Sequence, residues 1–203
     1  MATDAATKYP VTFTVDYPDR PMNRLTTAFR ILLAIPIFVI LGLFGQKSTI
    51  MIGAGGLLVV PILLMIVIRQ KYPRWWYEFN LHLLRFSNRA IAYLALLNDE
   101  YPSTDEEQGV HLEMSYPDVK NDLSRWAPLY KWFLAIPHYF VLTWLMVGVV
   151  LAVQIAWFAI LITGRYPRGL FDFVVGVLRW HNRVVGYAIA LVTDQYPPFS
   201  LKQ

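Results

Sequence analysis

The chain has 203 residues, of which 56% are apolar and 16% charged, and its formal net charge at pH 7 is +4. It contains 7 Trp, 12 Tyr and 12 Phe but no Cys. The apolar and aromatic content argues against a soluble domain, and the lack of Cys excludes disulfides and thiolate metal sites. Residues 1–8 lack an apolar run, so no cleaved signal peptide is predicted.

The first predicted element is a short strand over residues 11–15. Apolar and polar residues alternate there, and a Tyr-Pro follows at Tyr17-Pro18. A period of two with a bounding proline is typical of a strand. The same pattern returns at 110–114, before Tyr116-Pro117, so the two strands could pair and join the halves of the chain.

Two transmembrane helices are predicted next, over 24–44 and 50–68. Residues 50–68 form a run of 19 residues without a charge. About 20 apolar residues cross a hydrocarbon core of about 30 Å. The polar segment 45–49 is predicted to be the turn of this hairpin.

Residues 84–93 return at 178–187, Leu-Ala-Ile-Pro at 33–36 returns at 134–137, and each half closes on a Tyr-Pro. We therefore divide the chain into two tandem repeats, 1–103 and 104–203. The uncharged run 132–163 would be about 48 Å long as one helix, so two spans, 129–146 and 148–164, are predicted with a break near Gly148.

Of the 18 Lys and Arg, only Lys47 falls in a predicted hairpin turn. The positive-inside rule then places both termini in the cytoplasm. Both halves carry their charges at matching positions, so the repeats are expected to be parallel, with one orientation. The predicted fold is an all-α membrane protein of two tandem parallel repeats, each with a short cytoplasmic β-strand, a two-helix transmembrane hairpin and an amphipathic interfacial helix.

The interfacial helices are predicted over 75–97 and 170–192, where polar residues recur every three or four positions and form one stripe. A third span per repeat is the alternative, but its arginines would lie deep in the bilayer. The candidate functional residues of the stripes are Glu78, Arg85, Asn88 and Arg89 in the first repeat and Asp172, Arg179, Asn182 and Arg183 in the second.

The arginines could anchor lipid headgroups while pairing with Glu78 and Asp172, bind a specific anionic ligand, or contact a partner protein. Since the basic residues follow the membrane edge, anionic lipid is a better partner than nucleic acid. His residues with metal-ligand spacing, a phosphate-binding Gly loop and a Gly-x-Ser-x-Gly elbow are all missing, so no enzyme activity, metal or cofactor is predicted.

The second half contains Gly-Arg-Tyr-Pro at 164–167, an Arg-x-x-Asn-Arg helix and a closing Asp-x-Tyr-Pro-Pro-Phe at 194–199. These motifs resemble a bacterial integral-membrane family catalogued as domain of unknown function 4389. The resemblance extends to the first half, which lacks the closing Pro-Phe. It implies a bacterial cytoplasmic membrane location and brings no known activity.

Three functions remain open on the sequence alone. The first is a non-enzymatic accessory or scaffold subunit of a larger membrane complex, which contacts other membrane subunits or a second copy of itself. The second is a protein that binds or handles anionic lipid. The third is a small transporter or channel, against which the scarcity of charge within the predicted spans counts.

Overall fold

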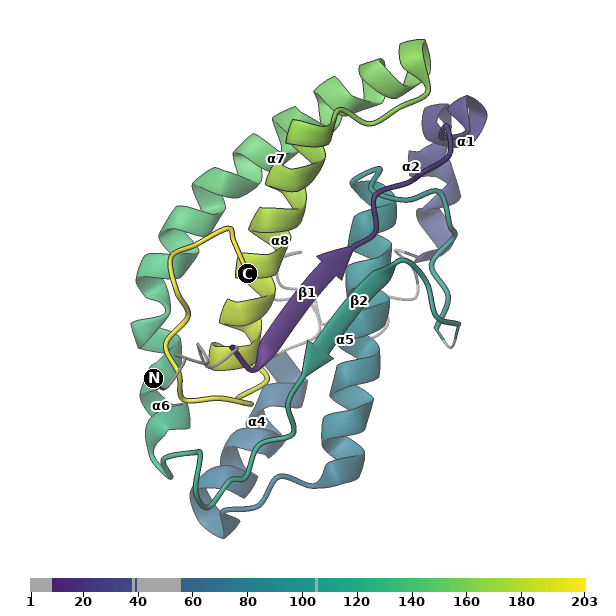
Figure 1. Ribbon diagram of the computed structural model, residues 1–203. Helices are drawn as coiled ribbons and strands as arrows, with labels where there is room; N and C mark the ends of the chain where they lie inside the picture. Colours follow the sequence, from purple (N-terminus) through teal and green to yellow (C-terminus); the bar gives the residue numbers. More distant parts are fainter. Residues whose placement is uncertain (1–8, 38, 40–55, 105) are drawn as a thin grey trace, which may run out of the picture.

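The structure is a computed structural model that describes residues 9–37, 39, 56–104 and 106–203. Most of the described chain is helical, and a small two-stranded sheet lies on one side of the helices (Figure 1). In chain order the elements are β1 (Val11–Val15), α1 (Arg24–Ala28), α2 (Arg30–Leu33), α4 (Gly56–Leu64), η1 (Met65–Arg69), α5 (Arg74–Leu94), β2 (Val110–Met114), α6 (Ala127–Leu134), α7 (Ile136–Thr163) and α8 (Arg168–Ala188).

Strands β1 and β2 are antiparallel and pair Phe13 with Leu112 at their centre. Their bounds confirm the predicted strands, and the pairing joins the two halves of the chain. Apolar residues of both strands point to one buried face, as Phe13 and Leu112 show, whereas His111 and Glu113 are exposed on the other face. One face of the sheet therefore belongs to the core, and the other is polar.

The buried face of the sheet is covered by helices from the opposite halves of the chain. Strand β1 packs against α8, and β2 packs against α5, so both helices lie behind the strands in Figure 1. Gly186 of α8 allows the closest approach, because a Cβ atom there would lie 2.5 Å from Cγ2 of Val11. Each half therefore completes its core with an element of the other half.

The predicted break near Gly148 is wrong. Helix α7 continues through this residue for 28 residues, which corresponds to about 42 Å. Gly148 instead faces α8, where a Cβ atom would lie 3.3 Å from Cζ of Phe173. The glycine brings two helices close together and does not end one, so the predicted spans 129–146 and 148–164 are not separate helices.

Helices α7 and α8 are antiparallel neighbours joined by a tight connection at Gly164, which has a left-handed φ of 76°. Helix α1 packs against α7 as well, and Trp157 donates its indole N–H to the carbonyl oxygen of Thr27 over 3.1 Å. The outward side of α7 is apolar and exposed. By length and composition, α7 is the one helix in the described chain that could cross a membrane.

In the first half, the predicted turn 45–49 and much of the adjoining predicted spans lie outside the described residues. The described end of the run 50–68 is helical, as α4 and η1. Helices α5 and α8 occupy most of the predicted segments 75–97 and 170–192, and each begins directly after a proline.

Candidate functional site

Arg85 and Arg179 bind the two strands of the sheet. Nε of Arg85 donates to the carbonyl oxygen of Leu112 over 3.0 Å, and Nε of Arg179 donates to that of Phe13 over 3.0 Å. These carbonyls belong to the central pair of the sheet. A two-stranded sheet has only edge strands, so the guanidinium groups satisfy backbone acceptors that would otherwise stay open.

Arg89 and Arg183 lie one helical turn further on, and their side chains are largely buried. Nη1 of Arg89 donates to the carbonyl oxygen of Ser103 over 2.9 Å. Arg183 holds the end of the chain, because Nη1 donates to the carbonyl oxygen of Ser200 over 3.2 Å and Nη2 to that of Lys202 over 2.6 Å. Both arginines therefore fix the segments that follow their own helices.

The surroundings of the second-half arginines change their acid–base behaviour. Burial lowers the pKa of Arg179, an effect that Asp172 opposes. Burial also lowers the pKa of Arg183, and the positive charge of Arg179 lowers it further. Arginine nevertheless keeps its proton in proteins, so both groups act as charged donors.

Asn88 and Asn182 form a reciprocal pair between α5 and α8. Each amide nitrogen donates to the amide oxygen of the other residue, over 2.9 Å and 2.7 Å. Each nitrogen also donates to the backbone carbonyl four residues earlier in its own helix. The side chains are only 4% and 1% exposed, so this fully bonded pair is a specific polar link inside the core.

Glu78 and Asp172 form ion pairs with arginines at the starts of their helices, and not with the arginines of the stripes as predicted. Glu78 pairs with Arg74 over 3.0 Å, and Asp172 pairs with Arg168 over 3.6 Å. Both are exposed pairs between residues four apart on one helix, and such pairs contribute little to stability.

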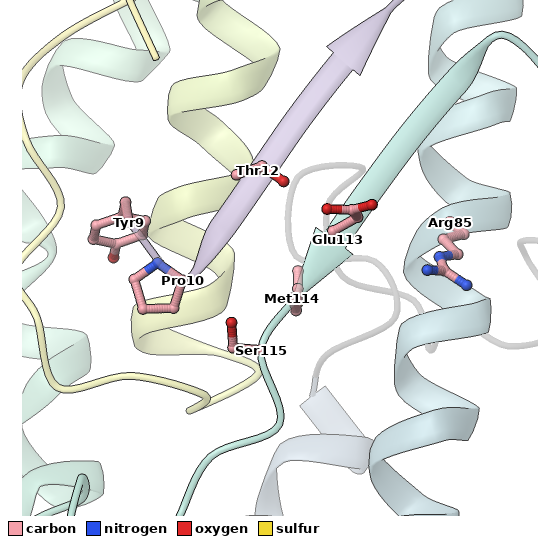
Figure 2. A pocket seen from close by; sticks show the side chains of 7 residues that line it. All are labelled: Tyr9, Pro10, Thr12, Arg85, Glu113, Met114 and Ser115. Carbon is pink, nitrogen blue, oxygen red and sulfur yellow. The ribbon is translucent and has the colours of Figure 1, made fainter. Parts of the chain in front are cut away.

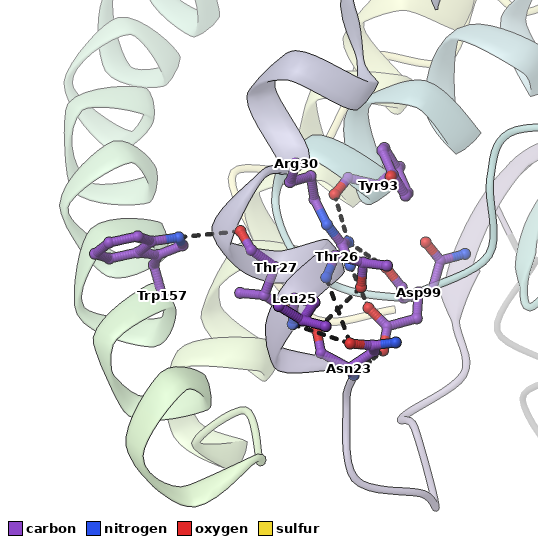
Figure 3. Close-up of polar contacts among 9 residues, drawn as sticks. Asn23, Leu25, Thr26, Thr27, Arg30, Tyr93, Asp99 and Trp157 are labelled. Carbon is purple, nitrogen blue, oxygen red and sulfur yellow. Dashed lines mark hydrogen bonds and ion pairs between the residues drawn. The ribbon is translucent and has the colours of Figure 1, made fainter.

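Two ion pairs with a buried basic partner and a partly exposed acid escaped the prediction. Arg30 pairs with Asp99 and also donates to the carbonyl oxygens of Tyr93 and Asn98, over 2.8 Å and 2.5 Å (Figure 3). The second carboxylate oxygen of Asp99 accepts the backbone N–H of Asn23 over 2.7 Å. This cluster ties the start of α1 and α2 to the end of α5.

The second ion pair joins Lys131 to Asp194 over 2.5 Å. Lys131 also donates to the carbonyl oxygen of Thr193 over 2.7 Å, and Asp194 accepts the N–H of Ser124 over 2.6 Å. The sequence carried a signal for both pairs. The basic residue stands three positions before Leu-Ala-Ile-Pro, and the acid two positions before Tyr-Pro, in each half.

A polar depression of about 450 Å³ lies beside the lower end of the sheet (Figure 2). Arg85 on α5 and Glu113 on β2 contribute its charges. The remaining lining residues are Tyr9, Pro10, Thr12, Met114 and Ser115. Within the described residues, no group of three or more His, Cys, Asp or Glu could hold a metal ion.

Together these features define a mostly helical protein with a two-stranded sheet, polar contacts that join its halves, and a long apolar helix. The sequence model of the family described as "Domain of unknown function (DUF4389)" matches residues 125–200, which supports the resemblance drawn from the motifs of the second half. Neither the curated proteins nor the solved structures contain a match to the chain.

Proposed function

We propose that the chain is a non-enzymatic membrane protein that acts as an accessory or scaffold subunit of a larger membrane complex. The observation that carries this proposal is the number of large apolar side chains that are exposed on the surface of the folded protein. On α7 alone, Phe140, Trp144 and Ile162 are 66–74% exposed. Contiguous exposed apolar surface of this kind is typical of contact with lipid or with another protein.

The proposal includes two tandem copies of one module, 1–103 and 104–203. Its support is that the same contacts recur at the positions that the internal sequence similarity matches. Tyr17 donates to the carbonyl oxygen of Tyr166, for example, and Tyr116 to that of Tyr72. Further matched residues are Arg85 and Arg179, Asn88 and Asn182, Arg89 and Arg183, Arg30 and Lys131, and Asp99 and Asp194.

We further propose that α7 lies along the membrane surface instead of crossing the bilayer. The segment from Tyr9 to Tyr17, which contains β1, runs along α8, because Tyr17 donates to the carbonyl oxygen of Tyr166 before this helix and Tyr9 to that of Gln195 after it. If α7 crossed the membrane, the polar face of the sheet would lie at bilayer depth, where its charged and polar groups are costly. A helix with protein on one side and acyl chains on the other is expected to be apolar all round.

This arrangement keeps the predicted sidedness without the break at Gly148. Basic residues flank α7 at both ends, with Arg125 and Lys131 before it and Arg165 and Arg168 after it. With α7 in the surface plane, all of them lie on the cytoplasmic side, as do both termini. In this proposal the membrane is the bacterial cytoplasmic membrane.

Binding of anionic lipid is the second candidate function. It is supported by Arg74 and Arg168, whose side chains are 82% and 65% exposed at the starts of α5 and α8. Trp75, also exposed, follows Arg74 and could lie at headgroup level. Arg89 and Arg183 are less suited to bind lipid, because their guanidinium groups already donate hydrogen bonds to backbone carbonyl oxygens of the protein.

Purification of the tagged chain in mild detergent tests the two functions together. A scaffold subunit is expected to co-purify with a second protein at fixed stoichiometry. In the reciprocal experiment, a tag on that second protein should recover this chain. A chain that purifies alone with anionic lipid enriched over the bulk membrane would contradict the scaffold function and support lipid binding. Purification without either would contradict both.

A further inference from the structure

We infer that the depression between Arg85 and Glu113 binds a short peptide segment of a partner subunit. This inference rests on the proposed scaffold function and names the chemistry of the partner. It starts from a difference between the two halves of the chain: the second half fills the matching place with its own residues 198–202, whereas none of the described residues of the first half does so.

In the second half, residues 198–202 run along α8. Arg179 donates through Nη1 to the carbonyl oxygen of Leu201 over 2.9 Å, and Arg183 donates through Nη2 to that of Lys202 over 2.6 Å. Gly176 makes room for this segment, because a Cβ atom there would lie 3.0 Å from Cβ of Leu201. Arginines of this stripe therefore already bind the backbone carbonyl oxygens of an irregular peptide segment in this protein.

In the first half, the chain that follows α5 contacts Arg89 at Ser103 and then turns toward β2. Toward the part of the chain that the structure describes, Arg85 donates only through Nε and Arg89 only through Nη1. Nη1 of Arg179 and Nη2 of Arg183 bind Leu201 and Lys202 in the second half. Among the described residues, the corresponding nitrogens of Arg85 and Arg89 have no acceptor. Arg85 thus offers both Nη groups at the edge of the depression (Figure 2).

Two small side chains keep this place open. Thr12 and Ser115 line the depression. The residues at the corresponding positions of the other repeat are His111 and Asp16. The latter two form a hydrogen bond over 3.1 Å, between Nε2 of His111 and Oδ2 of Asp16, at the other end of the sheet. The end that contains Arg85 has two hydroxyl side chains instead of this pair.

The charges of the depression favour a peptide over a phosphate group. Glu113 shares the depression with Arg85 and would repel a dianion. A peptide backbone carries both kinds of partner, carbonyl oxygens for Arg85 and N–H groups for Glu113. His82 stands on α5 where Gly176 stands on α8, so the ligand must pass this imidazole or displace it.

A labelled synthetic peptide with the sequence of residues 197–203 is the probe, because the chain itself shows how this segment binds arginine. The peptide is titrated with the purified full chain, and binding is followed by fluorescence anisotropy. Arg85→Gln is expected to weaken binding about tenfold or more, through the loss of charged hydrogen bonds. His82→Gly is expected to tighten it several-fold, since it recreates the space that Gly176 provides.

The matched controls are Arg74→Gln, at an exposed site of the same helix, and Arg179→Gln; neither should change binding by more than about twofold. Arg85→Lys keeps the charge but loses the planar guanidinium group, so it should give an intermediate affinity. This variant keeps the inference testable if the Gln variant fails to fold. Thermal unfolding checks that each variant is folded.

Equal affinity of the Arg85→Gln variant would overturn the inference. So would a dependence on Arg179, which would mean that the peptide only exchanges with the chain's own C-terminal segment. Binding of anionic-lipid vesicles that depends on Arg85, without peptide binding, would reassign the site to a headgroup. If the partner still co-purifies with the chain while the peptide fails to bind, only this inference is wrong and the scaffold function stands.

Discussion

Replacing Asp99 by Asn is expected to lower the free energy of unfolding by about 3–5 kcal/mol, because removal of one partner leaves the other charge buried and uncompensated. The charge left behind is that of Arg30, which is 2% exposed. The carbonyl oxygens of Tyr93 and Asn98 would still accept hydrogen bonds from it but carry no countercharge. The same substitution at Asp194 should have a similar effect through Lys131, which is 1% exposed.

Denaturant unfolding of the purified protein, followed by tryptophan fluorescence, measures these changes. Asp172→Asn is the matched control, since its ion pair with Arg168 is exposed and 3.6 Å long. It should cost less than about 1 kcal/mol. A loss at Asp99 no larger than at Asp172 would show that the ion pairs of Arg30 and Lys131 do not stabilise the fold as the structure indicates.

The second large effect is expected at the Asn88–Asn182 pair. Asn182→Leu should cost about 1–3 kcal/mol, because it leaves the buried amide of Asn88 without its partner. Adding Asn88→Leu removes the unpaired group, so the double variant should lose much less than the sum of the two single variants.

A double-mutant cycle on the unfolding free energies tests this coupling. Asn80 provides the control: it lies on α5, and within the described residues its amide donates only to the carbonyl oxygen of Trp76 in its own helix. Combined with Asn182→Leu, Asn80→Leu should give additive losses. Additive losses for Asn88 and Asn182 themselves would mean that the pair does not link the two helices energetically.

Local patterns in the sequence were sufficient to predict the two strands and the positions of α5 and α8. Alternation over five residues and a following Tyr-Pro gave β1 and β2 with their observed bounds. These signals depend on a few neighbouring residues, so they are visible without the fold. The repetition of residues 84–93 at 178–187 likewise directed attention to Asn88 and Asn182, which the structure brings together.

The partners of the charged side chains could not be predicted in this way. Arg85 and Arg179 bind backbone carbonyls of strands 27 and 166 residues away, and backbone acceptors leave no mark in a sequence. Gly148 was misassigned for a related reason: the residue that needs its small size, Phe173, lies on another helix. Sequence spacing therefore indicated which residues share a helix face but not what that face touches.

The placement of α7 along the cytoplasmic surface is the central claim, and cysteine labelling tests it most directly. The chain has no Cys, so single cysteines at Ser124 and Thr163, two exposed positions flanking the body of α7, are each the sole label. His111→Cys reports on the polar face of the sheet, and Leu151→Cys on the outward side of α7. With a membrane-impermeant reagent on cells, we expect the cysteines at 124, 163 and 111 to react only after permeabilisation, and the one at 151 to stay protected by lipid. Labelling of 124 and 163 from opposite sides of the membrane would show that α7 crosses it and would contradict the account.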